Sequence, residues 1–467
     1  MNTSARQPVP RTYPHRRRAL AVAFLLAVAW NTHALLTNEI VGDWRGGVGI
    51  TASNGLVSKW NDQHQLLNDD GLGPHNLTQT NAAAQPWSVS DAHGQPGILF
   101  PWSYDVPLPQ AFLNIPATLG GFDTENTTVY AVTTGPVAPT NQTVIWFAGT
   151  SSGWMRFSPL PNTPPCLLVG TQSSTIYPPL NPAVFVAASD KLKTVYRWNN
   201  LESTNAPQTR ITTTNGGSIG AGNGSEFYSG IIYRILVYKG VHTLAQRNAQ
   251  VAELAALHGV PTNYTKKAVC RGASTSEGVG STMLQSYPFQ LWQRYPEIEW
   301  HNQGLGGPIG TNGELGTTLY TTDPTTVDPL YDGSLQKNWL FVLAGIDDIY
   351  YDGLSGHATW QRLTNYVAAR KAAHPWTVVV STIQSDGTEP LINGDFNACI
   401  RANGGPWDAF VDPGLNSPTE SRLNNPGDTN YFYSDEIHLI NAGYSVIAVH
   451  FAPIVNVPRR STGSFWP

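Results

Sequence analysis

The segment Lys266-Lys-Ala-Val-Cys270-Arg-Gly-Ala-Ser274-Thr-Ser-Glu-Gly278 predicts a buried strand that ends in a turn and then a helix. The strand is expected at residues 266–271, and the turn between two glycines carries Ser274. A serine at the exit of a strand, where a helix begins, exposes its hydroxyl group beside backbone N–H groups that can bind an oxyanion. We therefore expect Ser274 at the carboxyl end of a strand, where open α/β sheets bind their ligands.

From this segment to the C-terminus, apolar runs of strand length alternate with longer runs of helical period. The further strands are predicted at 297–301, 339–344, 377–383 and 409–411, and the helices at 282–295, 360–373, 395–402 and 442–455. This alternation predicts a parallel sheet with helices on both faces.

The region before residue 260 has a different pattern. Short β-type runs are separated by clusters of Gly, Pro and Asn, and they lie at 128–134, 143–148, 166–170, 183–189, 194–198 and 230–238. Repeated short strands with turn signals predict an antiparallel sandwich or barrel. The capping box Thr243-Leu-Ala-Gln246 then begins a helix that Gly259 ends.

Composition supports a chain of more than one domain, because 467 residues exceed the roughly 150 residues of an average domain. Lys and Arg number 27 against 32 Asp and Glu, and no basic stripe is present, which argues against a nucleic-acid partner. The three cysteines, Cys166, Cys270 and Cys399, allow at most one disulfide. Their spacing predicts neither a metal site nor a disulfide framework, and we expect small buried side chains.

The N-terminus has the layout of a secretory signal. Arg16, Arg17 and Arg18 precede an apolar run at 19–30, and Thr32-His-Ala34 offers a small-residue cleavage site. The apolar run is too short to span a bilayer, so we expect no stable membrane span after processing. The protein is expected to be secreted, or else to keep residues 1–34 as an anchor and to be associated with a surface or particle.

Three further motifs follow predicted strands or precede the last helix. They are Asn302-Gln-Gly304-Leu-Gly-Gly307, Gly345-Ile-Asp347-Asp348 and Asp435-Glu-Ile-His438. Together with the segment around Ser274, they resemble the four spaced blocks of the SGNH (GDSL-type) hydrolases over about residues 265–456. The resemblance implies a flavodoxin-like α/β fold and a serine esterase that uses no cofactor.

The resemblance also implies a role for each matching residue. Ser274 would be the nucleophile, with Gly278 at the block's second glycine, a spacing that the alternative nucleophile Ser276 does not keep. His438 would be the general base, and Asp435 would orient its imidazole ring and stabilise the imidazolium.

The oxyanion hole would combine the backbone N–H groups of Ser274 and Gly307 with the residue at position 347. Two positions depart from the family: Ala273 replaces its usual Asp, and Asp347 replaces the Asn that donates to the oxyanion. An ionised carboxylate only accepts hydrogen bonds, and loss of one donor costs about 10²–10³ in rate. Asp347 is therefore kept protonated by burial and the neighbouring Asp348, or is turned away, or leaves the site slow or inactive.

The first region resembles the concanavalin-A-like lectin/glucanase (LamG-like) sandwich. The likeness rests on Gly55-Leu-Val-Ser-Lys-Trp60-Asn-Asp62 and on Phe227-Tyr-Ser-Gly230-Ile-Ile-Tyr-Arg-Ile-Leu-Val-Tyr238. No acidic pair alternates along one of its strands, so carbohydrate binding is expected rather than glycoside hydrolysis. Three tryptophans either stack on sugar rings or belong to the core, namely Trp146, Trp154 and Trp198.

These features together predict a multi-domain protein. The expected segments are a signal peptide or anchor (1–34), a carbohydrate-binding sandwich (35–260), an SGNH hydrolase domain (261–458) and a tail (459–467). The expected function is removal of acyl groups, such as acetyl, from a carbohydrate or polysaccharide through an acyl-enzyme. The alternative is a structural or adhesion protein, displayed on a surface or particle, whose SGNH-fold domain is weakly active or inactive.

Overall fold

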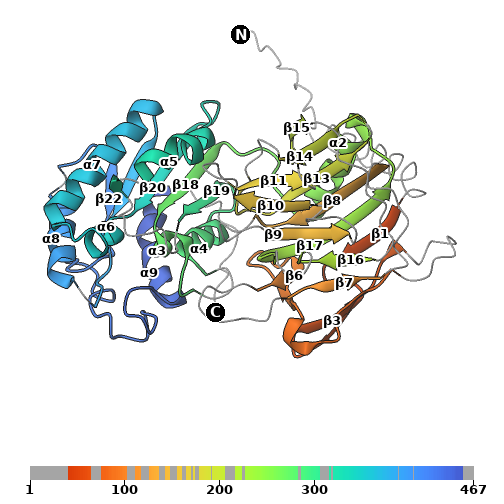
Figure 1. The fold of residues 1–467 in the computed structure, drawn as a ribbon, viewed down its shortest axis with the longest axis horizontal. Coiled ribbons are helices and arrows are strands. Elements are labelled where there is room, and N and C mark those ends of the chain that lie inside the picture. Colours follow the sequence, from red (N-terminus) through yellow and green to blue (C-terminus); the bar gives the residue numbers. More distant parts are fainter. Residues whose placement is uncertain are drawn as a thin grey trace, which may run out of the picture.

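The computed structural model shows an antiparallel β part and a parallel α/β part (Figure 1). The structure describes residues 40–455 except 65–74, 102–110, 117–125, 136–141, 148–154, 160–164, 170–171, 174–177, 191, 206–215, 223–226, 282–284, 306–314, 317–318, 388 and 403. The predicted signal or anchor and the predicted tail lie outside the described residues.

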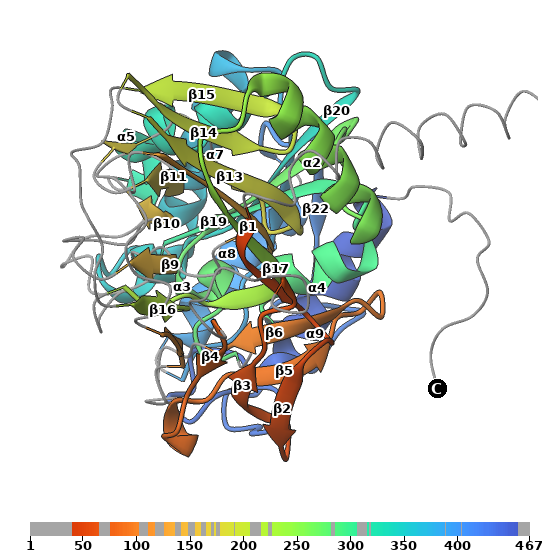
Figure 2. The same ribbon diagram turned by 90° about the vertical axis from the view of Figure 1, so that its right-hand side faces the viewer.

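The strands of the first part pair in one continuous antiparallel network. They are β1 (Ile40–Arg45), β2 (Ile50–Ser53), β3 (Leu56–Trp60), β4 (Leu77–Thr78), β5 (Trp87–Ser90), β6 (Pro96–Phe100), β7 (Leu113–Ile115), β8 (Thr127–Thr133), β9 (Gln142–Phe147), β10 (Met155–Pro159), β11 (Pro165–Val169), β12 (Gln172–Ser173), β13 (Ala183–Ser189), β14 (Thr194–Trp198), β15 (Leu201–Asn205), β16 (Gly217–Ile219) and β17 (Gly230–Lys239). Each predicted run corresponds to one of these strands. Figure 2 shows β13, β14 and β15 side by side, as their antiparallel pairing requires.

The central strands of this part are buried on both faces, and β8 shows how. Val129 and Ala131 belong to a core cluster that also contains residues of β9, β10 and β16, so two layers of strands face each other as in a sandwich. The alternate residues Tyr130 and Val132 belong to a second cluster that continues into the parallel sheet. Trp198 is only 6% exposed and lies in the first cluster, which favours the core interpretation for this residue.

The remaining predicted tryptophan sites cannot be placed in this way. Trp154 and the side chain of Trp146 lie outside the described residues. The side chain of Cys166 does too, whereas Cys270 is a buried free thiol and Cys399 a half-buried free thiol.

Helix α2 (Leu244–Leu257) connects the two parts and begins at the predicted capping box. The Thr243 side chain accepts from the backbone N–H of Gln246 at 3.3 Å, and the Gln246 side chain accepts from the Thr243 N–H at 2.8 Å. Gly259 follows with φ of +63°, a left-handed conformation that ends the helix.

The second part is a parallel sheet in the order β19-β18-β20-β21-β22. Its strands are β18 (Lys266–Gly272), β19 (Glu299–Gly304), β20 (Lys337–Leu343), β21 (Thr377–Ser381) and β22 (Ala409–Val411). Its helices are α3 (Ser274–Glu277), α4 (Tyr287–Arg294), α5 (Leu319–Thr326), α6 (Ile346–Tyr350), α7 (Gly356–Ala373), α8 (Pro390–Arg401) and α9 (Asn441–Phe451), with short 3₁₀ turns at Asp328–Leu330 and Ala452–Val455. The antiparallel part has a 3₁₀ turn at Ala82–Ala84. Counted along the chain this is the flavodoxin-like order 2-1-3-4-5, whose switch point lies between β18 and β20.

Several helix predictions differ from the structure. The helices expected at 360–373 and 395–402 begin earlier, at Gly356 and Pro390, and two further differences have a local cause. The helix expected at 282–295 begins only at Tyr287, because Pro288 fits only the first turn of a helix. Helix α5 was missed because Pro324 lies inside it, and its apolar residues have almost no helical period.

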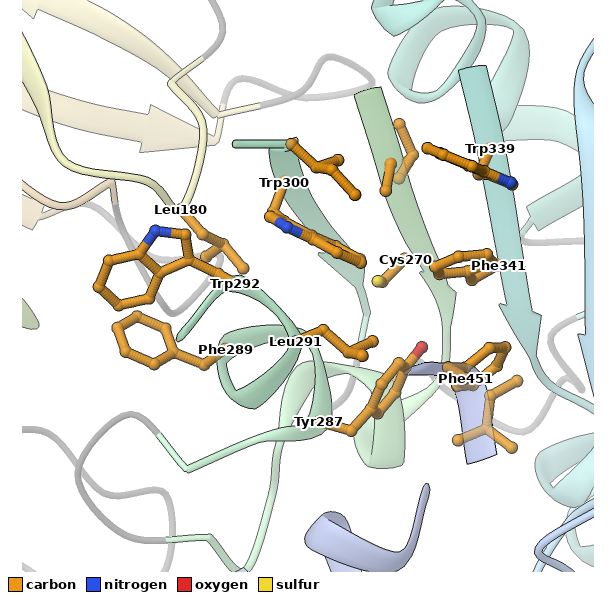
Figure 3. Close-up of a cluster of buried hydrophobic side chains, with 14 of the residues drawn as sticks. Leu180, Cys270, Tyr287, Phe289, Leu291, Trp292, Trp300, Trp339, Phe341 and Phe451 are labelled. Carbon is orange, nitrogen blue, oxygen red and sulfur yellow. The ribbon is translucent and has the colours of Figure 1, made fainter. Parts of the chain in front are cut away.

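The antiparallel part covers the free edge of the parallel sheet at β19. The backbone N–H of Leu180 donates to the Trp300 carbonyl at 2.7 Å, and Asn181 Oδ1 accepts from the Trp300 N–H at 2.8 Å. Asn181 Nδ2 also donates to the carbonyls of Ile298 at 2.8 Å and Pro296 at 3.1 Å. Leu180 lies in the same buried cluster as Trp300 (Figure 3). One short segment of the sandwich thus replaces the strand that would otherwise pair with this edge.

Candidate active site

Ser274 lies at the carboxyl end of β18, next to the switch point of the parallel sheet. The strand ends at Gly272, whose φ of +152° and whose approach to the Leu343 carbonyl leave no room for a side chain. A Cβ atom at this position would lie 1.8 Å from the Leu343 oxygen. Helix α3 starts directly afterwards at Ser274, and Gly278 ends it with φ of +107°. The first N–H groups of a helix have no partner within it, so that of Ser274 can face a ligand.

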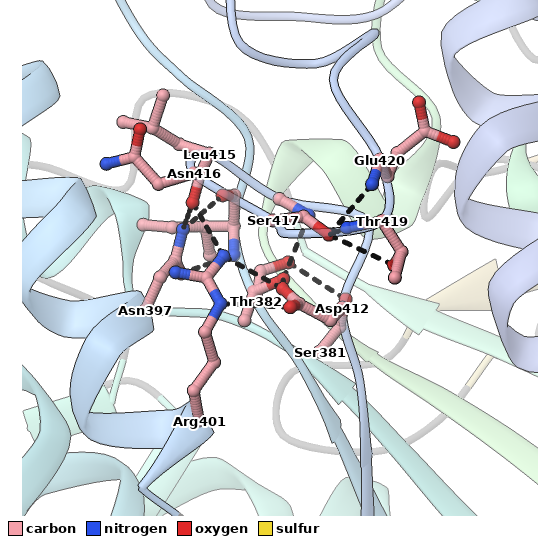
Figure 4. A network of polar contacts seen from close by, with 12 residues as sticks. Ser381, Thr382, Asn397, Arg401, Asp412, Leu415, Asn416, Ser417, Thr419 and Glu420 are labelled. Atoms are coloured by element: carbon pink, nitrogen blue, oxygen red, sulfur yellow. Dashed lines mark hydrogen bonds and ion pairs between the residues drawn. The ribbon is translucent and has the colours of Figure 1, made fainter.

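The other two predicted triad residues lie on the long loop between β22 and α9. The beginning of this loop is fixed to the sheet and to α8 by a partly buried polar network (Figure 4). The guanidinium group of Arg401 donates to both carboxylate oxygens of Asp412 at 2.9 Å, and the Thr382 hydroxyl donates to Asp412 at 2.9 Å. Asn397 Nδ2 also donates to the Leu415 carbonyl at 3.2 Å. These contacts restrict a segment that has little regular secondary structure of its own.

A second anchor lies further along the loop at Glu420, which is 8% exposed. Its carboxylate accepts from the Arg422 guanidinium at 2.8 and 2.5 Å and from two backbone N–H groups. It also lies 3.5 Å from His450 Nε2 on α9. Hydrogen bonds from Arg422 are the main reason that the pKa of Glu420 falls to about 2.

The structure brings Ser274, His438 and Asp435 together in one chain of hydrogen bonds. His438 Nε2 lies 2.8 Å from Ser274 Oγ, and His438 Nδ1 lies 2.5 Å from Asp435 Oδ2. An ionised carboxylate has no proton to donate, so Nδ1 carries the proton in this contact. In the neutral ring, Nε2 is then the acceptor for the Ser274 hydroxyl proton.

Asp435 is held in its ionised form by its surroundings. Burial acts to raise the pKa of Asp435, but hydrogen bonds from the His438 ring and from the backbone N–H groups of Ile437 and His438 outweigh it and lower the pKa to about 2. Both of these backbone bonds measure 2.9 Å. A fixed anion beside Nδ1 can stabilise the imidazolium form of His438.

The alternative nucleophile, Ser276, has a different environment. Its side chain is fully buried, and its hydroxyl group lies 3.3 Å from the carbonyl oxygens of Arg271 and Leu343 and from the Tyr287 hydroxyl. The structure therefore gives Ser276 a role in packing α3 against the sheet. It places Ser274, and not Ser276, beside His438.

A pocket of about 180 Å³ opens at the triad. Its described lining consists of Ser274, Val279, Ile346, Asp347, Tyr350, Tyr351, Asp386, Ile437 and His438. Gly307, the expected second oxyanion donor, lies outside the described residues.

Asp347 lines this pocket and is half-buried. Its neighbour Asp348 faces the other way and is fully buried. Asp348 accepts from the Leu315 N–H at 3.0 Å and from Arg362 at 2.8 Å. Burial raises the pKa of Asp348 in spite of these donors.

Three polar or aromatic residues of the pocket were not predicted from the sequence, namely Tyr350, Tyr351 and Asp386. Tyr350 is the last residue of α6 and Tyr351 follows it, shortly after the motif that contains Asp347. Asp386 follows the carboxyl end of β21, and the rule that ligands bind at strand ends could have identified it. Its carboxylate accepts from the Glu389 N–H at 2.6 Å and from Asn393 Nδ2 at 2.7 Å.

The described part of the chain contains neither a metal-binding cluster nor a membrane-spanning helix. Its residues include no group of three or more His, Cys, Asp or Glu side chains placed to hold a metal ion. No helix within the described ranges has the length and apolar character needed to cross a membrane.

Comparison with known proteins gave matches in structure only. No family model matches the chain, and no curated protein matches it. Among solved structures, a lipolytic protein of the G-D-S-L family from Veillonella parvula covers 40% of this chain and 97% of its own, at 14% identity and a TM-score of 0.32. A putative GDSL-like lipase from Bacteroides ovatus covers 74% of this chain and 83% of its own, at 10% identity and a TM-score of 0.31.

Another similar structure is a domain of a different kind of enzyme. Domain 4 of AbnA, an extracellular GH43 arabinanase from Geobacillus stearothermophilus, in complex with arabinotriose, covers 46% of this chain and 98% of its own. The identity is 12% and the TM-score 0.33. The similar structures thus include GDSL lipolytic proteins and a domain of a carbohydrate-acting enzyme. At these scores the function has to be argued from the geometry of the site.

Proposed function

We propose that this protein is an exported serine esterase of the SGNH kind, which removes acyl groups such as acetyl from a carbohydrate or polysaccharide. One observation carries the proposal: Ser274, His438 and Asp435 form a continuous chain of hydrogen bonds, of 2.8 and 2.5 Å, at the mouth of a pocket. This is the arrangement that a serine nucleophile, its general base and the group that orients the base require.

In the acylation step, Ser274 Oγ attacks the ester carbonyl carbon while His438 Nε2 takes the hydroxyl proton. The negative charge that develops on the carbonyl oxygen faces the backbone N–H at the start of α3. His438, now an imidazolium beside the Asp435 carboxylate, returns the proton to the leaving alcohol. The C–O bond to that alcohol breaks, and the acyl group remains on Ser274.

In the deacylation step, a water molecule takes the place of the alcohol. His438 accepts a proton from this water, whose oxygen attacks the acyl carbon. Collapse of the tetrahedral intermediate returns the proton to Ser274 and releases a carboxylic acid. The same three side chains therefore serve both halves of the reaction.

The carbohydrate substrate and export are supported by other parts of the chain. The attached antiparallel part, proposed as a lectin-like domain at 35–260 before a hydrolase domain at 261–458, would hold a polymer near the site. The basic and apolar segments at 16–18 and 19–30 support export through a signal at 1–34.

Hydrolysis of p-nitrophenyl acetate tests the proposal. We expect turnover by the parent chain and loss of turnover in Ser274→Ala. The matched control is Ser276→Ala, which removes a hydroxyl from the same short helix and should keep turnover. Loss in Ser276→Ala but not in Ser274→Ala would overturn the assignment of the nucleophile. Release of acetate from an O-acetylated polysaccharide then tests the substrate class.

Asp347 favours a second candidate function. A carboxylate in the pocket, where the SGNH family has an amide donor, suits a surface-associated structural or adhesion protein whose site is weakly active. A folded parent chain that hydrolyses no ester, although its triad is intact, would support this alternative.

A further inference from the structure

The described lining of the catalytic pocket carries two carboxylates, and its one basic side chain is the imidazole of His438. Asp347 and Asp386 contribute two carboxylates, and the described lining residues include no Lys or Arg. The carboxylate of Asp386 is held in place by hydrogen bonds of 2.6 and 2.7 Å and is only 1% exposed. Asp347 is more open to the pocket, being half-buried. A substrate group that enters this pocket therefore meets a negative potential.

Two tyrosines form an aromatic corner at the same pocket. Tyr350 is 44% and Tyr351 56% exposed, although most large aromatic side chains of the described chain are buried. Their ring centroids are 4.9 Å apart and the ring planes meet at 89°. The pKa of Tyr351 is raised by burial first and by the charge of Asp347 second, so the Asp347 carboxylate lies close to this corner. Aromatic faces next to a carboxylate attract organic cations.

We infer that the preferred ester carries an alkylammonium group, which binds between the Asp347 carboxylate and the corner formed by Tyr350 and Tyr351. The inference rests on the proposed function, because it concerns the substrate of the same site. The pocket volume of about 180 Å³ fits a small group, since a cavity of about 150 Å³ holds one benzene molecule. The ammonium group could belong to an amino sugar of a polysaccharide or to a small ammonium alcohol.

This inference gives a physical reason for an aspartate at position 347. An ionised Asp347 repels the oxyanion that forms during acylation and so raises the activation free energy. A neutral ester has no charge that could offset this repulsion. A bound ammonium group neutralises the carboxylate at the moment when the oxyanion forms. The preference for a cationic ester should therefore appear in kcat as well as in KM.

The test compares acetylcholine with 3,3-dimethylbutyl acetate, which has the same shape and the same acetyl ester but no charge. At neutral pH and low salt, we expect the full chain to show a kcat/KM ratio of roughly tenfold or more in favour of acetylcholine. In Asp347→Asn the ratio should fall close to one, and turnover of the neutral ester should rise about tenfold. Asp395→Asn removes an exposed charge on α8, outside the pocket lining, and should leave the ratio unchanged.

The outcomes separate this inference from the proposed function. Equal hydrolysis of both esters by the parent, or a ratio that survives in Asp347→Asn, would overturn the inference and leave the esterase assignment intact. Hydrolysis of neither ester by the folded parent would count against the proposed function itself. A second pair, O-acetylated chitosan with free amines and the same polymer after N-acetylation, distinguishes the two sources. Faster acetate release from the free amine form identifies an amino sugar, and equal release with acetylcholine still preferred identifies a small alcohol.

Discussion

Replacing Asn181 by alanine should destabilise the whole molecule, because this side chain closes the edge of the parallel sheet. Asn181 is fully buried and makes three hydrogen bonds to the backbone, one with the Trp300 N–H and two with the carbonyls of Ile298 and Pro296. Each buried backbone group left without a partner costs about 1–3 kcal/mol. Since one of the carbonyls is bonded at the longer distance of 3.1 Å, we expect a total loss of roughly 2–5 kcal/mol.

Urea unfolding followed by tryptophan fluorescence and by far-UV circular dichroism measures this loss. The parent should unfold in one transition, because a single buried cluster joins both sheets. Asn200→Ala is the matched control: its amide donates to the Thr262 carbonyl at 3.0 Å in an exposed position, so the change should stay within about 0.5 kcal/mol. An unfolding midpoint for Asn181→Ala equal to that of Asn200→Ala would refute the argument that the sandwich completes the edge of β19.

Three other perturbations test the site and its support. Ser274→Ala and His438→Ala should each abolish turnover of p-nitrophenyl acetate without altering the circular dichroism spectrum, and Asp435→Asn should cost less; full activity in either alanine variant would contradict the triad. Deleting residues 40–260 should remove activity on small and polymeric esters alike, because it uncovers β19 and removes part of a shared core. A truncated chain that still cleaves the small ester would mean that the parallel part folds alone. The pKa of Glu420 is lowered from 4.5 to about 2. The stability that its ionised carboxylate contributes is therefore complete above pH 4.5 and is lost as the pH falls towards 2. Glu420→Gln should lower the thermal midpoint at about pH 7 more than at about pH 3, and an equal decrease at both pH values would disprove a stabilising role for this charge.

The local features of this protein could be predicted from the sequence because they depend on neighbouring residues. The capping box of α2 needs only Thr243 and the residue three positions later, and the bounds of β13 and β14 follow from two apolar runs between turn residues. The strand, turn and serine around Ser274 are local in the same way. The hydrogen bond between Asp435 and His438 joins residues three positions apart, so their sequence spacing already brings them near each other.

The tertiary structure decided which distant groups meet. Ser274 and His438 are 164 positions apart, and only the flavodoxin-like strand order, with the loop fixed through Asp412 to α8, brings them within hydrogen-bond distance. Asn181 resembles an ordinary turn residue in the sequence, yet its partners lie 115 to 119 positions away. The sequence also did not determine whether Asp347 lies at the pocket. In the structure it lines the pocket together with Tyr351. Periodicity and turn chemistry act over a few residues, whereas the closing of a site or a sheet edge depends on how completed elements pack, and that packing is encoded by the whole chain at once.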